Sequence, residues 1–471
     1  MMTRETGNSY DVIIIGAGPA GIFSGLELAR RSKEKVSVAI IEKGPDIDAR
    51  ICPSTEGKSA CRRCDPCSVV SGWGGAGAFS DGKLTLSTQV GGMLDLYTGE
   101  ANLRHLIDYV DKIYLHFGAP GQVWGEDEEA IHELERKALL AELKLIPAPI
   151  RHLGTGKTQK ILEGMKEELS SFADIILGDS AKEILVEDNK AAGVLTSKGR
   201  VLKGSYVIAA PGRDGAEWLS GEARRLGLSM AINPVDIGVR VELPAVVAEP
   251  LTRVSYESKL IYHSRSFDDK VRTFCMCPYG QVVTESSDGL ITVNGHTHSE
   301  KKTENTNFAL LVSKTFTEPF KDPIAYGKYV AGLANLLGNG VIVQRLGDLI
   351  NGRRSIKERI AKGTVVPTLK DATPGDLSLV FPYRHLVSIM EMLKALDAVA
   401  PGIYSRNTLL YGVEVKFYSS RLEVNDVLET QVRNLFAIGD GAGVTRGLMQ
   451  ASASGVVAAR EILRRLDSSS Y

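Results

Sequence analysis

The chain has 471 residues, 43% hydrophobic and 24% charged, which is enough to bury large cores and to hold two domains. Its 56 lysines and arginines nearly balance its 57 aspartates and glutamates, and this net charge of −1 gives no reason to expect a nucleic-acid partner. No apolar stretch approaches the length of a membrane span, and residues 1–6 lack a signal-peptide core. We therefore expect a soluble, cytoplasmic protein.

The N-terminal sequence predicts a turn that binds a dinucleotide. Residues 10–15 form a β-branched apolar run typical of a buried parallel strand, and residues 22–31 carry apolar side chains at helical spacing. Between them lies Gly16-Ala17-Gly18-Pro19-Ala20-Gly21, a Gly-x-Gly-x-x-Gly turn. The first glycine permits the tight turn, the second lets the backbone approach a pyrophosphate, and the third lets helix and strand pack closely. The orphan amides of the helix N-terminus would then face the phosphates.

A second strand is expected over residues 36–41, followed by Glu42 and Lys43. A carboxylate at this position is about where the ribose hydroxyls of a dinucleotide would be held. A helix N-terminus without a ligand is the alternative. The order of strand, glycine turn, helix, second strand and acid favours the dinucleotide.

The middle of the chain alternates between irregular and periodic segments. Residues 43–87 are irregular and rich in glycine and cysteine, and a long loop of this kind is usually functional. Helical patterns over 103–117 and 126–145 predict a helical insertion that spans residues 96–150. A further helix over 157–172 leads into short strands and then to residues 206–212, a buried strand that ends in a glycine turn containing Ala210 and Gly212.

From about Asn233 the pattern changes to broken strands, with helices expected over 323–337 and 382–399. We assign residues 233–405 to an inserted substrate, or cap, domain. The nucleotide-fold pattern then returns. Residues 434–440 form an apolar strand that ends in Gly439-Asp440, and a helix opens at Gly447-Leu448-Met449.

A glycine turn near one end of the chain and a Gly-Asp strand end near the other fit FAD. Asp440 would hold the ribityl and phosphate part of the cofactor, while the ADP half lies on the first loop. The helix that opens near Gly447, Leu448 and Met449 would aim its amides at the flavin edge where negative charge develops on reduction. A core strand followed by a solvated aspartate is the alternative for Asp440 taken alone.

Four longer motifs carry a family resemblance. They are Gly-Trp-Gly-Gly-Ala-Gly-Ala-Phe-Ser-Asp-Gly-Lys-Leu at 72–84, Phe-Cys-Met-Cys-Pro at 274–278, Gly-Val-Glu-Val-Lys at 412–416 and Ala-Ile-Gly-Asp-Gly-Ala-Gly-Val-Thr-Arg-Gly at 437–447. With them the chain resembles the glutathione-reductase-type flavoproteins, and most closely the poorly characterised FAD-dependent dehydrogenases. The resemblance implies that Gly74, Gly75, Ala76 and Gly77 approach the flavin or its pyrophosphate, and that Ala181 meets the adenine through its backbone.

The expected fold class is α/β: a Rossmann-like FAD-binding domain with an inserted α+β substrate domain. We expect residues 1–95, 151–232 and 406–471 to form the FAD-binding domain.

Cys52, Cys61, Cys64 and Cys67 follow the spacing C-x8-C-x2-C-x2-C. Three closely spaced thiolates and a more distant fourth suit a [4Fe–4S] cluster better than zinc, which more often uses two separated pairs. Four reduced thiols without a metal, or a structural zinc, are the alternatives.

Three other residues are candidates for catalysis. Lys83 is a candidate for contact with the flavin N5 or the substrate, or else is a solvated loop lysine. Cys275 and Cys277 are one residue apart on an expected strand, so their side chains should share a face. They are redox-active thiols beside the flavin, or simply small buried hydrophobes.

Together these features predict an FAD-dependent oxidoreductase that transfers two electrons between the flavin and a small organic substrate. Electrons would come from transient NAD(P)H, or from an electron-donor protein through the cysteine cluster. A flavin monooxygenase or oxidase is the alternative enzyme, and a non-catalytic flavin-binding redox sensor is the alternative without turnover.

Overall fold

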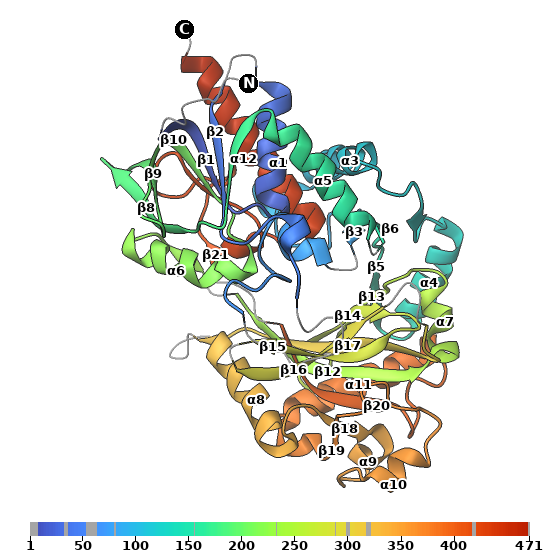
Figure 1. Ribbon diagram of the computed structural model, residues 1–471. Helices are drawn as coiled ribbons and strands as arrows, with labels where there is room; N and C mark the ends of the chain where they lie inside the picture. Colours follow the sequence, from blue (N-terminus) through green and yellow to red (C-terminus); the bar gives the residue numbers. More distant parts are fainter. Residues whose placement is uncertain are drawn as a thin grey trace. The chain divides into compact units, whose positions relative to one another are not determined.

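The computed structural model describes residues 8–32, 36–52, 64–79, 82–154, 156–231, 233–287, 289–297, 302–316, 322–416 and 421–469. The chain forms two compact units, which Figure 1 shows coloured along the sequence. The first unit consists of Met1–Gln122, Arg151–Ala231 and Ser419–Tyr471. The second consists of Val123–Ile150 and Ile232–Tyr418.

The first unit is built on a sheet whose parallel strands run in the order β7-β2-β1-β10, with β22 paired to β10. The first part of β10 also pairs antiparallel with β9, which pairs with β8. The bounds are β1 Ser9–Ile15, β2 Val38–Glu42, β7 Ala173–Leu177, β8 Ala181–Glu187, β9 Lys190–Thr196, β10 Val201–Ala209 and β22 Leu435–Ala437. The β-branched apolar residues of β1 and β2 are buried, as expected for parallel strands covered on both faces. Pairing of β22 with β10 brings the C-terminal part of the chain into the sheet that begins at the N-terminus.

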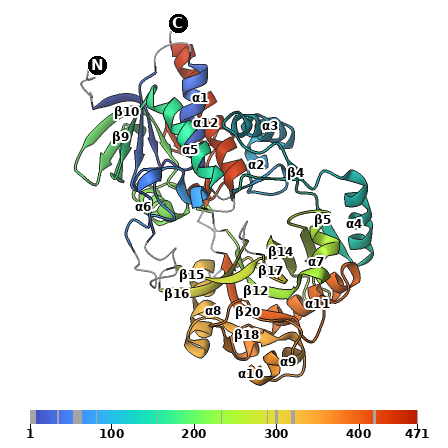
Figure 2. The same cartoon turned by 45° about the vertical axis from the view of Figure 1, so that its right-hand side comes forward.

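Helices from distant parts of the sequence pack together in this unit. In Figures 1 and 2, α1, α5 and α12 lie side by side next to the parallel strands. The helices are α1 Pro19–Arg31, α2 Asp95–Thr98, α3 Glu100–His116, α5 Lys157–Ser170, α6 Ala216–Arg225 and α12 Leu448–Ser469. Gly455 of α12 permits close contact with α1, because a Cβ atom there would lie 2.2 Å from the carbonyl oxygen of Ala20. Helix–helix contact therefore fixes the start of α1 relative to α12.

The second unit contains an eight-stranded sheet in the order β19-β18-β20-β12-β17-β14-β13-β5. The strands are β5 Leu143–Ile146, β12 Val235–Pro244, β13 Lys259–His263, β14 Lys270–Cys277, β17 Asn305–Lys314, β18 Ile342–Arg345, β19 Thr373–Pro374 and β20 Leu409–Lys416. A separate hairpin joins β15 Gln281–Ser287 to β16 Leu290–His296. The helices of this unit are α4 Glu128–Leu140, α7 Ala245–Thr252, α8 Pro323–Gly338, α9 Leu346–Ile350, α10 Lys357–Ala361 and α11 Tyr383–Val399.

The two faces of the large sheet differ in chemistry. Alternate residues of β12 and β17, among them Val239 and Leu310, pack with α8 and α11 in an apolar core. Arg240, between two of these core positions, has a fully buried side chain and pairs with Glu414 of β20. Strand alternation therefore places a charged pair on the face opposite the helices.

The structure differs from the expected layout in two places. The pattern over 126–145 holds helix α4 and then strand β5, which pairs with β13. Accordingly, the section 96–150 is divided at Gln122, and its second part belongs to the second unit. Strand β20, expected within the C-terminal nucleotide fold, lies between β18 and β12, because its apolar side chains complete the core of the second unit.

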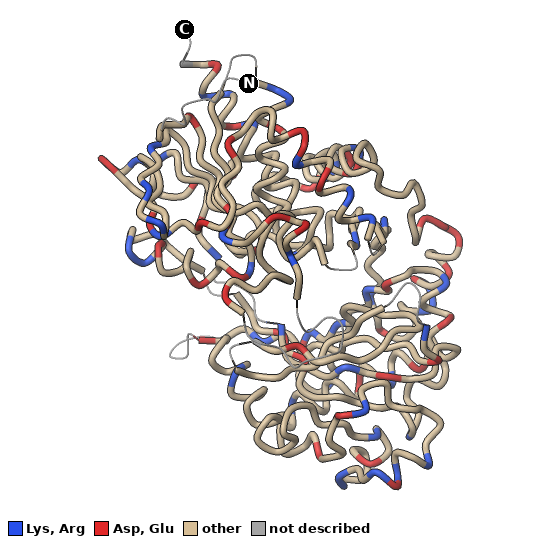
Figure 3. The backbone as a smooth tube through the Cα atoms, in the orientation of Figure 1, with Lys and Arg blue, Asp and Glu red and all other residues tan. Residues whose placement is uncertain are grey.

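The predicted α/β fold class is confirmed by the parallel sheet of the first unit and the mixed sheet of the second. Figure 3 shows acidic and basic residues interspersed on both units. None of the described helices combines the length and the apolar character that crossing a bilayer would require.

Candidate functional site

A pocket of about 380 Å³ lies in the first unit, where the parallel strands end. Its wall includes Gly16 after β1, Glu42 at the end of β2, Ala210 after β10 and Asp440 after β22. The carboxyl edge of a parallel sheet is the usual ligand site of such folds, and the volume suits a small molecule.

The turn after β1 and the first turn of α1 require glycine at positions 16 and 21. Gly16 has a φ of +100°, and a Cβ atom there would lie 2.2 Å from the carbonyl oxygen of Ala210. A Cβ atom on Gly21 would lie 1.9 Å from the carbonyl oxygen of Gly16. Gly18 is the N-cap of α1 and contributes no side-chain cap, so the helix reaches the pocket with its first-turn amides uncapped by a side chain. Such a terminus favours an anion.

Glu42 holds three backbone segments around the pocket. One carboxylate oxygen accepts the amide of Ala17 at 2.9 Å, and the other accepts those of Gly44 at 2.8 Å and Gly72 at 2.9 Å. A carboxylate has about four acceptor positions. Glu42 therefore organises the glycine turn and the loop near Gly72, and retains about one acceptor position for a ligand hydroxyl.

A second glycine segment packs directly against the first. The amide of Gly74 donates to the carbonyl oxygen of Ala17 at 2.8 Å. Gly75, with a φ of +60°, begins the 3-10 helix η2 (Gly75–Phe79), and a Cβ atom on it would lie 3.0 Å from the Cα of Gly18. The two loops thus meet backbone to backbone at the pocket wall.

Arg50 supports this second segment from within the unit. Its guanidinium donates to the carbonyl oxygens of Ser68 at 2.9 Å, Val69 at 2.9 Å and Trp73 at 2.7 Å. Burial lowers the pKa of Arg50 to about 10, against the raising effect of the Glu42 charge. The arginine stays charged near neutral pH and fixes the loop by hydrogen bonds.

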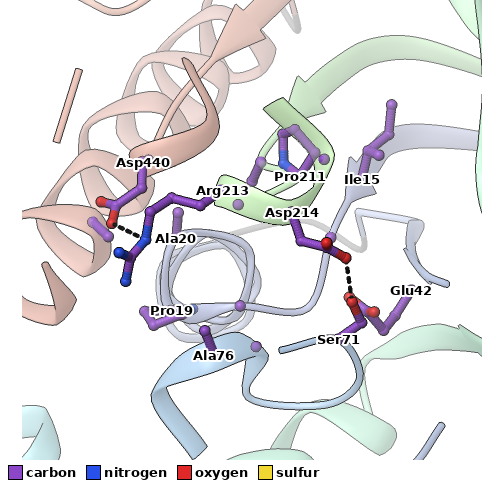
Figure 4. Close-up of a pocket in the computed structure, with 18 of the residues that line it drawn as sticks. Ile15, Pro19, Ala20, Glu42, Ser71, Ala76, Pro211, Arg213, Asp214 and Asp440 are labelled. Carbon is purple, nitrogen blue, oxygen red and sulfur yellow. Dashed lines mark hydrogen bonds and ion pairs between the residues drawn. The ribbon is translucent and has the colours of Figure 1, made fainter. Parts of the chain in front are cut away.

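Asp440 approaches the pocket from the C-terminal part of the chain (Figure 4). Its Oδ1 accepts the hydroxyl of Thr445 at 2.8 Å and the amide of Gly447 at 3.1 Å. Its Oδ2 lies 3.6 Å from Nε of Arg213. Helix α12 begins immediately after Gly447, so Asp440 is tied to the start of this helix.

A second polar group on the pocket wall centres on Asp214. Its carboxylate pairs with Lys43 and accepts the hydroxyl of Ser71 at 2.6 Å. Burial raises the pKa of Asp214, but the hydrogen bonds from Lys43 and Ser71 outweigh this effect and hold it below its usual value. This aspartate is therefore ionised near neutral pH.

Most of the candidate cofactor-binding residues meet at this pocket. The wall includes Gly16, Gly18, Pro19, Ala20, Glu42, Lys43, Gly75, Ala76, Gly77, Ala181, Ala210, Gly212, Gly439, Asp440, Gly447 and Leu448. Ala17, Gly21, Gly74 and Met449 are outside the wall, and the first three shape the glycine loops through their backbones. Their roles toward a cofactor stay predictions.

Sequence reasoning missed Ser71, Arg213, Asp214 and Trp218, which also line the pocket. A signal for two of them was available. Arg213 and Asp214 directly follow the predicted strand 206–212, whose carboxyl end had to reach the same sheet edge. Ser71 lies in an aperiodic loop, where no pattern singles it out.

The three candidate catalytic residues are not part of the pocket wall. Lys83 opens strand β3 (Lys83–Thr85) of the first unit and is half-buried. Cys275 and Cys277 belong to β14 in the second unit, where the register with β17 shifts between Phe274 and Cys277. Cys275 has a φ of +46° at this bulge, and Cys277 is fully buried while Cys275 is partly exposed. The regular alternation expected for these two thiols is therefore interrupted.

The candidate metal ligands are described in part. Cys52 and Cys67 are half-buried and Cys64 is exposed, whereas Cys61 lies outside the described residues. Within the described segments, no three histidine, cysteine, aspartate or glutamate side chains gather into a group that could hold a metal ion. Cys52, Cys64 and Cys67 therefore do not form such a group by themselves.

Comparison with known proteins places the chain near FAD-dependent proteins. The model of a family described as "FAD-dependent protein, C-terminal domain-like" matches residues 234–417. A Clostridium beijerinckii protein described as uncharacterized is 27% identical over 484 residues, covering 97% of this chain and 81% of its own length. Formate oxidase of Aspergillus oryzae RIB40 is 12% identical with a TM-score of 0.46, covering 99% of this chain and all of the oxidase chain (100%). L-Proline dehydrogenase from P. horikoshii is 13% identical with a TM-score of 0.38, covering 97% of this chain and 94% of that chain. Over residues 234–417, the chain is thus similar to FAD-dependent proteins.

Proposed function

We propose that this protein is an FAD-dependent oxidoreductase that moves two electrons between the flavin and a small organic substrate. One observation carries the proposal: the glycine turn at Gly16 and the carboxylate of Asp440, from opposite parts of the chain, line one pocket at the carboxyl edge of a parallel sheet. The family match over residues 234–417 supports the same cofactor.

The residues of the pocket suit each part of FAD. The N-terminus of α1 and the glycines at 16, 18 and 75 offer backbone amides and close approach to a pyrophosphate. The remaining acceptor position of Glu42 suits a ribose hydroxyl. Oδ2 of Asp440, the carboxylate oxygen nearer Arg213, suits a hydroxyl of the ribityl chain. FAD, when bound, would supply a ring that accepts and donates two electrons. The start of α12 would place a positive dipole end near that ring.

Residues outside the pocket wall complete the proposal. We assign substrate binding to the second unit, which contains the segment matched by the FAD-dependent family. Lys83 is proposed as a proton donor, and Cys275 and Cys277 as thiols that take part in electron transfer. Once a substrate is found, each of these three roles is tested by replacing the residue and following single-turnover reduction of the bound flavin.

Replacing Asp440 with alanine is expected to weaken FAD binding by about ten- to hundredfold, because a hydrogen bond to a charged group contributes about 1.5–3 kcal/mol. Asp426 is exposed and outside the pocket wall, so Asp426→Ala is the matched control and should bind FAD like the unaltered protein. Titration of the apoprotein with FAD, followed by flavin fluorescence, measures both. Equal affinities for the two variants would contradict the role of Asp440, and failure of the unaltered protein to bind FAD would refute the proposed function.

The electron source is proposed from the sequence alone. We infer that a [4Fe–4S] cluster on Cys52, Cys61, Cys64 and Cys67 receives electrons from a donor protein, or that NAD(P)H binds transiently. The cysteine spacing supports the cluster, whereas Cys52, Cys64 and Cys67, the three described thiols, do not form a metal-holding group by themselves. Metal analysis of anaerobically purified protein should find about four irons per chain. Zinc, or no metal, would rule the cluster out.

A further inference from the structure

The described wall of the pocket carries more negative than positive charge. Its anionic side chains are Glu42, Asp214 and Asp440, and its cationic side chains are Lys43 and Arg213. The ammonium group of Lys43 is paired with Asp214. A pyrophosphate that enters this pocket would therefore need either backbone amides alone or the guanidinium of Arg213.

Arg213 is held loosely in its present position. Its side chain is 68% exposed, and its Nε lies 3.6 Å from Oδ2 of Asp440, beyond the usual 2.7–2.9 Å of a charged hydrogen bond. Figure 4 shows the side chain extending toward Asp440 from the 3-10 helix η3 (Arg213–Gly215), which follows β10. An ion pair with one exposed partner and a separation of 3.6 Å contributes little stability, so the guanidinium can leave Asp440 at small cost.

The backbone around this pair is, in contrast, tightly packed. A Cβ atom on Gly441 would lie 2.4 Å from the carbonyl oxygen of Gly212, so the loops that carry Asp440 and Arg213 touch each other. A Cβ atom on Gly439 would lie 3.0 Å from the Cβ of Ala20, in the first turn of α1. Asp440, the partner of Arg213, directly follows Gly439, so the Arg213–Asp440 pair is carried next to the first turn of α1, the helix terminus that favours an anion.

We propose that Arg213 exchanges Asp440 for the cofactor's pyrophosphate when FAD binds. This inference rests on the proposed function and adds a residue that positions the cofactor. Arginine presents a planar fork that binds phosphate oxygens with two parallel hydrogen bonds. Its departure leaves Oδ2 of Asp440 open to a cofactor hydroxyl, while Thr445 and Gly447 keep the carboxylate in place through Oδ1.

The exchange couples the two halves of the cofactor site. Before binding, Arg213 neutralises Asp440. After binding, the same charge neutralises phosphate, and the polyol hydroxyl takes the vacated oxygen. Arg213 should consequently strengthen the binding of every ligand that carries the pyrophosphate, whereas Asp440 should strengthen the binding only of ligands that carry the polyol chain.

ADP separates these contributions, because it has the pyrophosphate and adenosine but lacks the polyol and flavin. With apoprotein and calorimetric titration, Arg213→Gln should weaken ADP and FAD by about tenfold each, as expected for the loss of a charged hydrogen bond. Arg213→Lys keeps the charge but not the planar fork, so its affinities should fall between those of the unaltered protein and those of Arg213→Gln. Asp440→Asn should weaken FAD but not ADP, because ADP lacks the polyol and no longer has to take Arg213 from a carboxylate. Arg104→Gln, at an exposed arginine of α3, is the matched control and should leave both affinities unchanged.

An ADP affinity of Arg213→Gln within twofold of the unaltered protein would overturn the exchange and leave Arg213 as a counterion of Asp440 alone. Rising salt should weaken ADP binding to the unaltered protein more than to Arg213→Gln, and equal salt dependence would also contradict the proposal. If the unaltered protein binds ADP but not FAD, the proposed function fails while the role of Arg213 toward pyrophosphate is still measured. If the unaltered protein binds neither ADP nor FAD, both the proposed function and the role of Arg213 are contradicted.

Discussion

Glu42→Ala is expected to reduce the affinity for FAD by more than about a hundredfold and to destabilise the first unit by about 3 kcal/mol or more. The carboxylate accepts the amides of Ala17, Gly44 and Gly72, and its own side chain is buried. Alanine would leave three enclosed donors without an acceptor, and each such group costs about 1–3 kcal/mol. The glycine turn and the loop near Gly72 would then lose the group that joins them at the pocket wall.

The experiment compares Glu42→Ala with Glu167→Ala, at an exposed position of α5 in the same unit. FAD titration gives the affinity, and hydrogen exchange of peptides that cover β1 and the loop near Gly72 gives the local stability. Glu42→Gln retains one acceptor oxygen and should lie between alanine and the native residue. Native-like exchange in Glu42→Ala would show that the three amides find other partners, and would contradict the organising role of this side chain.

The parallel sheet and most of the pocket could be predicted from the sequence because each signal is local. The strand before Gly16, the acid at the end of β2 and the Gly-Asp after β22 are each encoded by a few adjacent residues. The rule that parallel strands end at a common edge then brings them together. No long-range information was required.

The features that were missed depend on contacts between distant segments. Strand β5 follows helix α4 with no break in the apolar pattern, and only pairing with β13 makes it a strand. The bulge at Cys275 exists because β14 gains a residue relative to β17. Ser71 reaches Asp214 across 143 positions of sequence. The local periodicity of the sequence does not encode these contacts between distant segments.

A second large effect is expected in the second unit, where Glu414→Ala should lower the free energy of unfolding by about 3–5 kcal/mol. The carboxylate receives Nε of Arg240 at 2.7 Å and Nη2 at 2.9 Å, and both side chains are fully buried. Burial lowers the pKa of Arg240, but the Glu414 charge outweighs it and holds the pKa above its usual range. Glu414→Ala removes that raising effect, but a guanidinium is effectively always protonated in proteins, so Arg240 would stay charged and lose its counterion.

The remaining partners of Arg240 cannot replace the lost charge. The guanidinium also donates to the carbonyl oxygen of Cys275 at 2.7 Å and to the side-chain oxygens of Asn307 at 3.2 Å and Asn294 at 3.1 Å, all of which are neutral. Lys416, which lies 3.2 Å from Glu414, would lose the same counterion. Two cations would thus share a largely buried space without that carboxylate.

Urea unfolding followed by hydrogen exchange of peptides from β12 and β20 measures the effect within the second unit. Glu358→Ala, at an exposed position of α10, is the matched control and should change the unfolding free energy by less than about 0.5 kcal/mol. Replacing both partners, as Arg240→Met with Glu414→Leu, should recover most of the loss, because the penalty comes from an unpaired buried charge rather than from the absence of the pair. If the double variant is as unstable as Glu414→Ala, the hydrogen bonds of Arg240 to Cys275, Asn294 and Asn307 stabilise this face of the sheet, and the charge balance is secondary.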